Sequence, residues 1–221
     1  MQPAPLPPPR RIEPRWPVAL TIGVVLVLLT VLPDRIRLFP GWVTYLLGLG
    51  ILAALALVPI SGGTPRVLRL ERWVTLLFCL CVGAGTLAGL RHLLMEMFDP
   101  SGDLDGLELL TSSVAVWVLG ILTFALVYWQ GDRGGPEARR RDLSTRPDWL
   151  FPQADLEHIL PHWQPTFVDY LFLAYTTATA FSPTDVAPIS PRAKLMLMAQ
   201  SLVSLATILV VVSRAINILG S

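Results

Sequence analysis

The chain has 221 residues, of which 53% are hydrophobic and 15% are charged, and its mean hydropathy is +0.58. This composition excludes an ordinary soluble globular domain and indicates an integral membrane protein of the all-α class, with the lipid bilayer as its main partner. The formal net charge of +1, without a basic patch interleaved with aromatic residues, gives no reason to expect nucleic acid as a partner.

Residues 1–17 are rich in proline and arginine, and we expect them to form a disordered tail that ends in an interfacial anchor, Trp16. The apolar run that follows, Val18–Leu32, is short for a membrane span and could belong to a signal peptide. Because no small-residue cleavage site follows this run, we interpret it as the first transmembrane helix.

Three further apolar runs are long enough to cross a bilayer, whose ~30 Å hydrocarbon core requires roughly 20 helical residues. They are Trp42–Ile60, Trp73 to about Leu94, and Leu107–Trp129, so residues 18–129 form a region of four transmembrane helices. A basic loop with Arg66, Arg69 and Arg72 is expected before the third helix. Small residues at four-residue steps in that helix (Cys81, Gly85 and Gly89) favour close packing, either within the bundle or between two copies of the chain.

Two polar segments carry patterns that resemble metal sites without meeting their requirements. The acidic residues of Met95–Glu108 lack the spacing of a calcium-binding loop, and Pro161 disrupts the helical register that His158 and His162 would need to share a metal ion. We therefore expect no metal and no other cofactor. We interpret residues 130–166, in which GDRGGPEARRRD follows Gln130, as a polar loop that continues along the membrane surface.

The last quarter of the chain, residues 167–221, has the pattern of a helical hairpin. Phe167–Ala180 would cover about 21 Å as a helix, which is short for a crossing and favours a re-entrant half-helix or a short sixth helix. A polar turn, Phe181–Pro188, separates it from a long apolar helix over Ala193–Leu219. We therefore predict five spanning helices and a pore-loop-like hairpin, whose turn must be covered by protein or line a wet cavity.

The candidate functional residues lie in this hairpin. The pore-turn candidates are Thr177, Thr179, Ser182, Pro183, Thr184, Asp185 and Pro188. Four polar residues form one stripe on the last helix, namely Gln200, Ser204, Thr207 and Arg214. The stripe could line a pathway or make interhelical hydrogen bonds. We expect Asp185 to anchor the turn at the start of the last helix, where Arg192 and Lys194 are close enough in sequence to add an ion pair.

The turn resembles the filter region of the tetrameric potassium-channel pore family, T-x-T-T-V-G-Y-G-D-x-x-P. Four residues match the pattern: Thr177, Thr179, Asp185 and Pro188. Ser182 and Thr184 stand at the two glycine positions, and Pro183 replaces the tyrosine. The resemblance implies an oligomeric, ion-channel-like or transport-related membrane protein that handles a small ion. Because the family's glycines let successive carbonyls point at the ion, we do not expect a standard potassium filter here.

A second resemblance rests on two segments together, W-x-x-D-R-G-G-P over Trp129–Pro136 and the S-P-T-D turn. This pairing is similar to an uncharacterised family of bacterial multi-pass membrane proteins, which implies a location in the inner (plasma) membrane. The alternative function is a non-conducting membrane scaffold or partner subunit. We do not expect an enzyme, because no nucleophile–base pair, metal cluster or cofactor motif occurs at a sensible spacing.

The distribution of arginine predicts the orientation of the chain in the membrane. If residue 1 is cytoplasmic, the outside loops hold Arg35, Arg37 and Arg91. The inside segments then hold Arg10, Arg11, Arg15, Arg66, Arg69, Arg72, Arg133, Arg139, Arg140, Arg141 and Arg146. The positive-inside rule therefore predicts that the N-terminus and residues 130–166 are cytoplasmic. In the potassium-channel family the loop between the outer helix and the pore hairpin is extracellular. For residues 130–166 we base the predicted orientation on the charge distribution instead.

Overall fold

The computed structural model describes residues 13–33, 40–98, 106–141, 145–156, 158–160, 163–183 and 185–220. Four of its helices are long and apolar enough to cross a membrane: α2 (Gly41–Ile60), α3 (Pro65–Phe98), α4 (Gly106–Gly131) and α7 (Pro191–Gly220). A fifth apolar helix, α1 (Trp16–Val31), is shorter, at 16 residues. The chain is therefore a mostly helical, multi-pass membrane protein.

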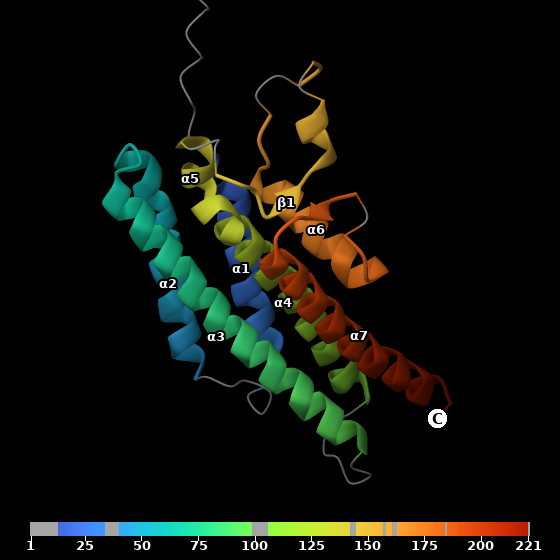
Figure 1. The fold of residues 1–221 in the computed structure, drawn as a ribbon. Coiled ribbons are helices and arrows are strands. Elements are labelled where there is room, and N and C mark those ends of the chain that lie inside the picture. The colour runs from blue at the N-terminus through green and yellow to red at the C-terminus, as the bar shows by residue number, and fades with distance from the viewer. Residues whose placement is uncertain are drawn as a thin grey trace, which may run out of the picture.

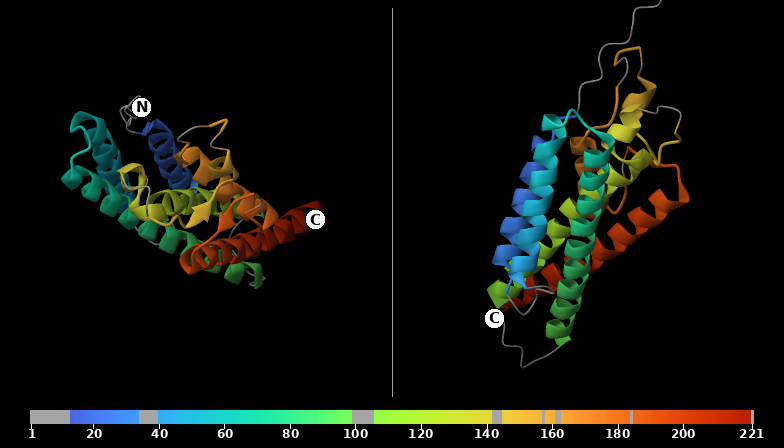
Figure 2. Two further views of the ribbon diagram at one scale, coloured as in Figure 1. Left: turned by 45° about the horizontal axis from the view of Figure 1, so that its top comes forward. Right: turned by 90° about the vertical axis from the view of Figure 1, so that its left-hand side faces the viewer.

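Helix α4 lies at the centre of the molecule (Figure 1) and packs against α3, α6 (Phe167–Ala180) and α7, with α1 beside it. Helix α2 packs on the far side of α3, and α7 runs alongside α4 toward the end of the bundle where α4 begins (Figure 2). The exposed faces of these helices are apolar, as a lipid-facing surface requires.

The bounds of α6 agree with the predicted Phe167–Ala180, and a capping box explains where it begins. The Thr166 backbone N–H donates to Asp169 Oδ2 at 2.7 Å, and the Thr166 side chain caps the N3 backbone N–H in return. The helix ends at Phe181, whose φ of 54° is left-handed. A reciprocal cap and a left-handed terminus together fix this helix at 14 residues.

The chain then returns to the end of the bundle where α4 ends. Strand β2 (Ala187–Pro188) pairs antiparallel with β1 (Trp149–Leu150), and Trp149 lies opposite Pro188. Trp149 also packs against Tyr128 near the end of α4, with ring centroids 5.0 Å apart. The start of α6 and the strand after its turn are therefore at the same end of the molecule.

Two predicted boundaries are wrong. The expected basic loop with Arg66, Arg69 and Arg72 is helical, because α3 begins at Pro65, a residue favoured in the first helical turn. The expected disordered tail cannot extend to residue 17, because Glu13 and Arg15 are buried and α1 begins at Trp16. Residues 1–12 lie outside the described part of the chain.

Candidate functional site

The hydroxyl groups at the end of α6 are engaged by their own helix. Thr177 is fully buried and donates to the Leu173 carbonyl at 2.7 Å, while the exposed Thr179 donates to the Tyr175 carbonyl at 2.9 Å. In the turn that follows, Ser182 and Asp185 are exposed, Pro183 and Pro188 are half-buried, and Thr184 lies outside the described residues. Ser182 and Asp185 are therefore accessible on a single chain, whereas Val186 of the same turn is buried.

The turn is anchored by Asp148, and the expected role of Asp185 is wrong. Asp185 is exposed, whereas Arg192 binds the carboxylate of Asp148 through its Nε, at 2.6 Å, and its Nη2. The same carboxylate accepts a 2.5 Å hydrogen bond from the Ser190 hydroxyl, and the Asp148 carbonyl accepts one from the Ile189 N–H at 2.8 Å. Ser190 in turn accepts the Ala193 N–H, as an N-cap does.

The polar stripe of α7 faces the other helices of the same chain. Gln200, Ser204 and Thr207 are buried, and the side chain of Arg214 lies outside the description. Gln200 bridges two helices, because its Oε1 accepts a 2.5 Å hydrogen bond from the Tyr128 hydroxyl and its Nε2 donates to the Ala174 carbonyl at 2.6 Å. The contacts of Gln200 are interhelical hydrogen bonds, which was one of the two interpretations of the stripe.

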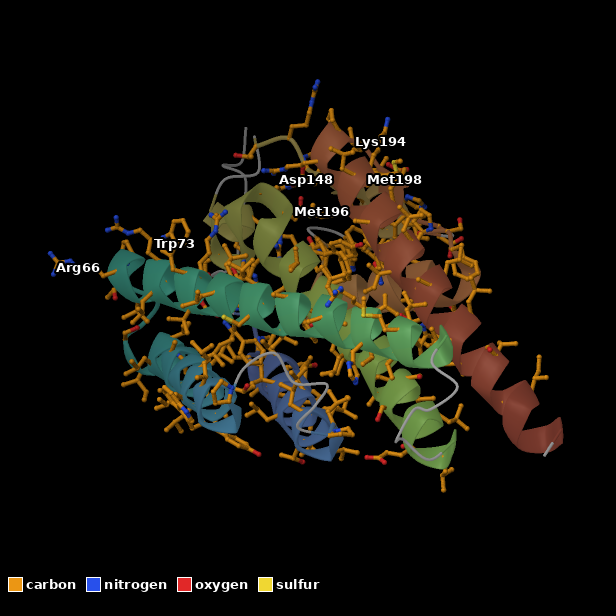
Figure 3. All side chains as sticks on the ribbon, turned by 90° about the horizontal axis from the view of Figure 1, so that it is seen from below. Arg66, Trp73, Asp148, Lys194, Met196 and Met198 are labelled. Carbon is orange, nitrogen blue, oxygen red and sulfur yellow. The ribbon has the colours of Figure 1, made fainter. Side chains whose placement is uncertain are left out.

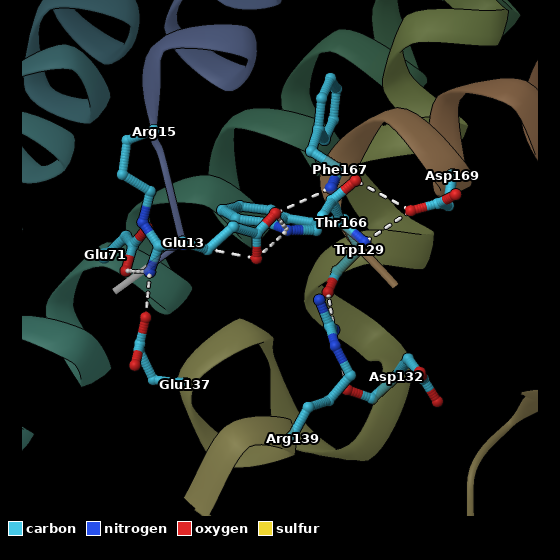
Figure 4. Close-up of polar contacts among 10 residues, drawn as sticks. All are labelled: Glu13, Arg15, Glu71, Trp129, Asp132, Glu137, Arg139, Thr166, Phe167 and Asp169. Carbon is cyan, nitrogen blue, oxygen red and sulfur yellow. Dashed lines mark hydrogen bonds and ion pairs between the residues drawn. The ribbon is translucent and has the colours of Figure 1, made fainter. Parts of the chain in front are cut away.

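A buried aspartate, Asp132, joins α4 to α6 and to β1. Its Oδ1 accepts the Asp148 N–H at 2.8 Å, and its Oδ2 accepts the Tyr170 hydroxyl at 2.6 Å. Arg139 donates to the carbonyls of Trp129 and Asp132, at 2.5 and 3.2 Å (Figure 4). Its guanidinium lies 4.8 Å from the centre of the Tyr170 ring. The predicted surface loop therefore begins with residues that are packed into the core, Asp132 and Arg139.

These contacts explain the motif W-x-x-D-R-G-G-P. The Trp129 indole N–H donates to both carboxylate oxygens of Glu13, at 3.2 and 3.3 Å. Gly134 and Gly135 have φ values of 83° and 107°, a region that side chains with a Cβ rarely adopt. Pro136 begins the short helix α5 (Pro136–Arg141). The motif thus turns the chain sharply after α4 and brings Arg139 back to its end.

A second polar cluster surrounds one guanidinium, that of Arg15 (Figure 4). Its Nε lies 3.0 Å from Glu71 Oε1, its Nη2 lies 3.4 Å from Glu137 Oε1, and its Nη1 lies 3.8 Å from Glu13 Oε2. Glu13 also accepts the Phe167 N–H at 2.8 Å. The cluster ties the start of α1 to α3, α5 and α6. Because three carboxylates share the single positive charge of Arg15, the cluster has excess negative charge, and a further cation nearby would be stabilised.

The expectation of no metal site can be compared only with the described residues. Among the described residues, no group of three or more His, Cys, Asp and Glu side chains could hold a metal ion. His162 and most of the acidic loop, residues 99–105, lie outside the description. Cys79 and Cys81 are free thiols.

The sequence singled out the hairpin but missed the polar clusters that hold it. Glu13 and Arg15 stand in a proline-rich segment, and Asp148 stands in a polar loop 42 residues before its partner Ser190, so no local pattern links them. Comparisons with known proteins identify no relative, since no family model, curated protein or solved structure matches the chain. The channel resemblance therefore rests on the residues of the turn.

Proposed function

We propose that the chain is a transport-related membrane protein of the pore-hairpin type, which works as an oligomer in the plasma membrane. One observation carries this proposal: α6 is a half-helix whose following turn returns to the end where the half-helix began, before α7 starts. Pore-loop proteins use such hairpins, one from each subunit, around a shared axis. The exposure of Phe181, Ser182 and Asp185 on a single chain suits a turn that faces such an axis.

The chemistry of the turn favours weak selection among monovalent cations. A potassium filter of the usual kind needs a backbone that aims successive carbonyls at the ion, and glycine at two positions permits it. Arg133 and Phe181 are the non-glycine residues with positive φ in the described chain, so Ser182 keeps an ordinary backbone. The exposed carboxylate of Asp185 then remains to attract a cation.

The test is the bi-ionic reversal potential of the purified protein in planar bilayers, with its oligomeric state measured in parallel. We expect cation currents with little discrimination between potassium and sodium, and a smaller current for Asp185→Asn. The matched control is Asp155→Asn, which changes another exposed carboxylate, outside the hairpin. An oligomer that carries no current, or a protein that stays monomeric, would overturn the proposal.

The alternative, a non-conducting scaffold or partner subunit, is favoured by a different observation. Gln200, Ser204 and Thr207 of the polar stripe on α7 are buried within one chain, and Gln200 makes hydrogen bonds to α4 and α6. Such a protein would be electrically silent and would use its exposed turn to contact another protein. A photo-crosslinker at Ser182 distinguishes the two, because it would link copies of this chain in a pore and a different protein in a scaffold.

A further inference from the structure

A pocket of about 290 Å³ lies between the start of α3 and the turn after α4. Its volume is close to the lower end, roughly 300 Å³, of the pockets that hold small molecules. The polar side chains in its lining are Arg69, Glu71, Arg72, Gln130 and Glu137. Two guanidinium groups and two carboxylates therefore surround one space, an arrangement that complements a ligand carrying both a positive and a negative group.

Two buried atoms of this lining lack hydrogen-bond partners among the described residues. They are Glu71 Oε1, an acceptor, and Gln130 Nε2, a donor, and both residues are 1% exposed. Glu71 Oε1 lies 3.0 Å from Arg15 Nε but without the geometry of a hydrogen bond. Because buried polar groups are rarely left unsatisfied, Gln130 Nε2 indicates a ligand with an oxygen acceptor, and Glu71 Oε1, which forms an ion pair with Arg15, can accept one further N–H donor.

A separate apolar groove of about 470 Å³ lies further along the same face of α3. Leu68 and Arg72 in the pocket are followed at helical spacing by Leu76, Leu80 and Leu87 in the groove. From Leu76 to Leu87 the helix rises about 17 Å, roughly half of the ~30 Å hydrocarbon core and so about one leaflet. The groove is therefore of the length and polarity that suit one acyl chain.

The other walls of the groove keep it open. Gly120 and Thr123 of α4 form its floor, and Ala199 and Val203 of α7 form the opposite wall. A Cβ added at Gly120 would have no atom within 4 Å, so the absence of a side chain there leaves free space. Small residues thus create a groove between two helices that large side chains would fill.

Exposed tryptophans place the pocket at the level of the lipid headgroups. Trp16 and Trp73, adjacent in sequence to Arg15 and Arg72, are 68% and 69% exposed. Trp73 projects from the start of α3 away from the other helices, as does Arg66 one turn beyond Arg69 (Figure 3). Because tryptophan gathers at the membrane–water interface, the pocket lies beside that interface and the groove lies below it.

We infer that pocket and groove together bind one phospholipid whose headgroup carries a primary ammonium group. Glu71 and Glu137 accept hydrogen bonds from the ammonium, while Arg69, Arg72 and Gln130 donate to the phosphate. Arg72 already donates through Nη1 to the Gly134 carbonyl at 2.7 Å, and arginine has four further N–H groups. A choline headgroup fits poorly because its quaternary ammonium has no N–H to donate.

The test compares phosphatidylethanolamine with phosphatidylcholine of the same acyl chains, titrated into the full-length protein in detergent. Binding is measured by native mass spectrometry and by the rise in melting temperature. We expect clear preference for phosphatidylethanolamine, and roughly tenfold weaker binding for Arg69→Gln and for Glu137→Gln, each of which loses a charge-assisted hydrogen bond. Arg66→Gln, an exposed arginine outside the pocket, is the matched control and should keep full affinity.

A groove variant keeps the test independent of the charged cluster. Gly120→Leu should fill the groove and weaken lipid binding, whereas Gly23→Leu, at another open glycine position, should not. Soluble glycerophosphoethanolamine should fail to raise the melting temperature, because it lacks the acyl chain. Equal binding of the two lipids, stabilisation by the soluble headgroup alone, or unchanged binding in Gly120→Leu would each overturn the inference.

Discussion

Tyr170 of α6 donates a 2.6 Å hydrogen bond to the buried carboxylate of Asp132 at the end of α4. This bond fixes α6 to the central helix α4, and both residues are shielded from water. Such shielding makes a hydrogen bond to a charged group costly to remove, because the carboxylate loses a donor that solvent cannot replace.

The first prediction follows from this contact. Tyr170→Phe should lower the free energy of unfolding by about 1.5–3 kcal/mol, the range typical of hydrogen bonds to charged groups. Tyr175→Phe is the control, because Tyr175 lies on the same helix and is 52% exposed. The measurement is unfolding in mixed detergent micelles, and equal stability of the two variants would contradict the prediction.

The second prediction compares Asp148, which anchors the turn, with Asp185, which lies within it. Asp148→Ala removes acceptors for Ser190 and Arg192 and should lower the melting temperature clearly. Because the Arg192 side chain is 62% exposed, solvent compensates part of its loss, and we expect about 1–3 kcal/mol in total. Asp185→Ala, at an exposed position, should leave the melting temperature almost unchanged. A larger loss for Asp185→Ala would return the anchoring role to that residue.

A third prediction concerns the glycines after α4. Gly135→Ala should destabilise the protein by about 1–3 kcal/mol, because its φ of 107° is strained for any residue with a Cβ. The added Cβ would also lie 3.0 Å from Gln130 Oε1. Gly131→Ala, four residues earlier in the last turn of α4, has open space and should be neutral or stabilising. Thermal unfolding of the purified variants distinguishes these outcomes.

The fourth prediction concerns the orientation of the chain in the membrane. It depends on the arginine distribution, with eleven arginines in the segments predicted to be cytoplasmic and three in the predicted outside loops. Ser144 and Ser101 lie in segments predicted to be on opposite sides of the membrane, but both are outside the described residues. We therefore place the single reporter cysteines at the exposed Ala154 and Glu108. With Cys79 and Cys81 replaced, an impermeant reagent added outside intact cells should label Glu108→Cys and spare Ala154→Cys. The reverse pattern would place the N-terminus outside.

The sequence alone predicted most of the helices, because a helix that spans a membrane is specified by a local property. About 20 apolar residues in a row satisfy the hydrocarbon core wherever they occur, and α2 and α4 agree with their predicted ranges to within two residues. The same holds for α6, since Thr166 and Asp169, three residues apart, define its start. These features needed no knowledge of the rest of the chain.

The tertiary structure decided which polar residues hold the hairpin in place. Glu13 meets Trp129 and Phe167 across 116 and 154 residues, and Asp148 meets Arg192 across 44 residues. In sequence, Glu13 stands in a proline-rich segment and Asp148 in a polar loop, and each looks solvated. Their burial depends on how α1, α4, α6 and α7 come together at one end of the bundle, because a charge leaves water only where distant partners replace its hydration.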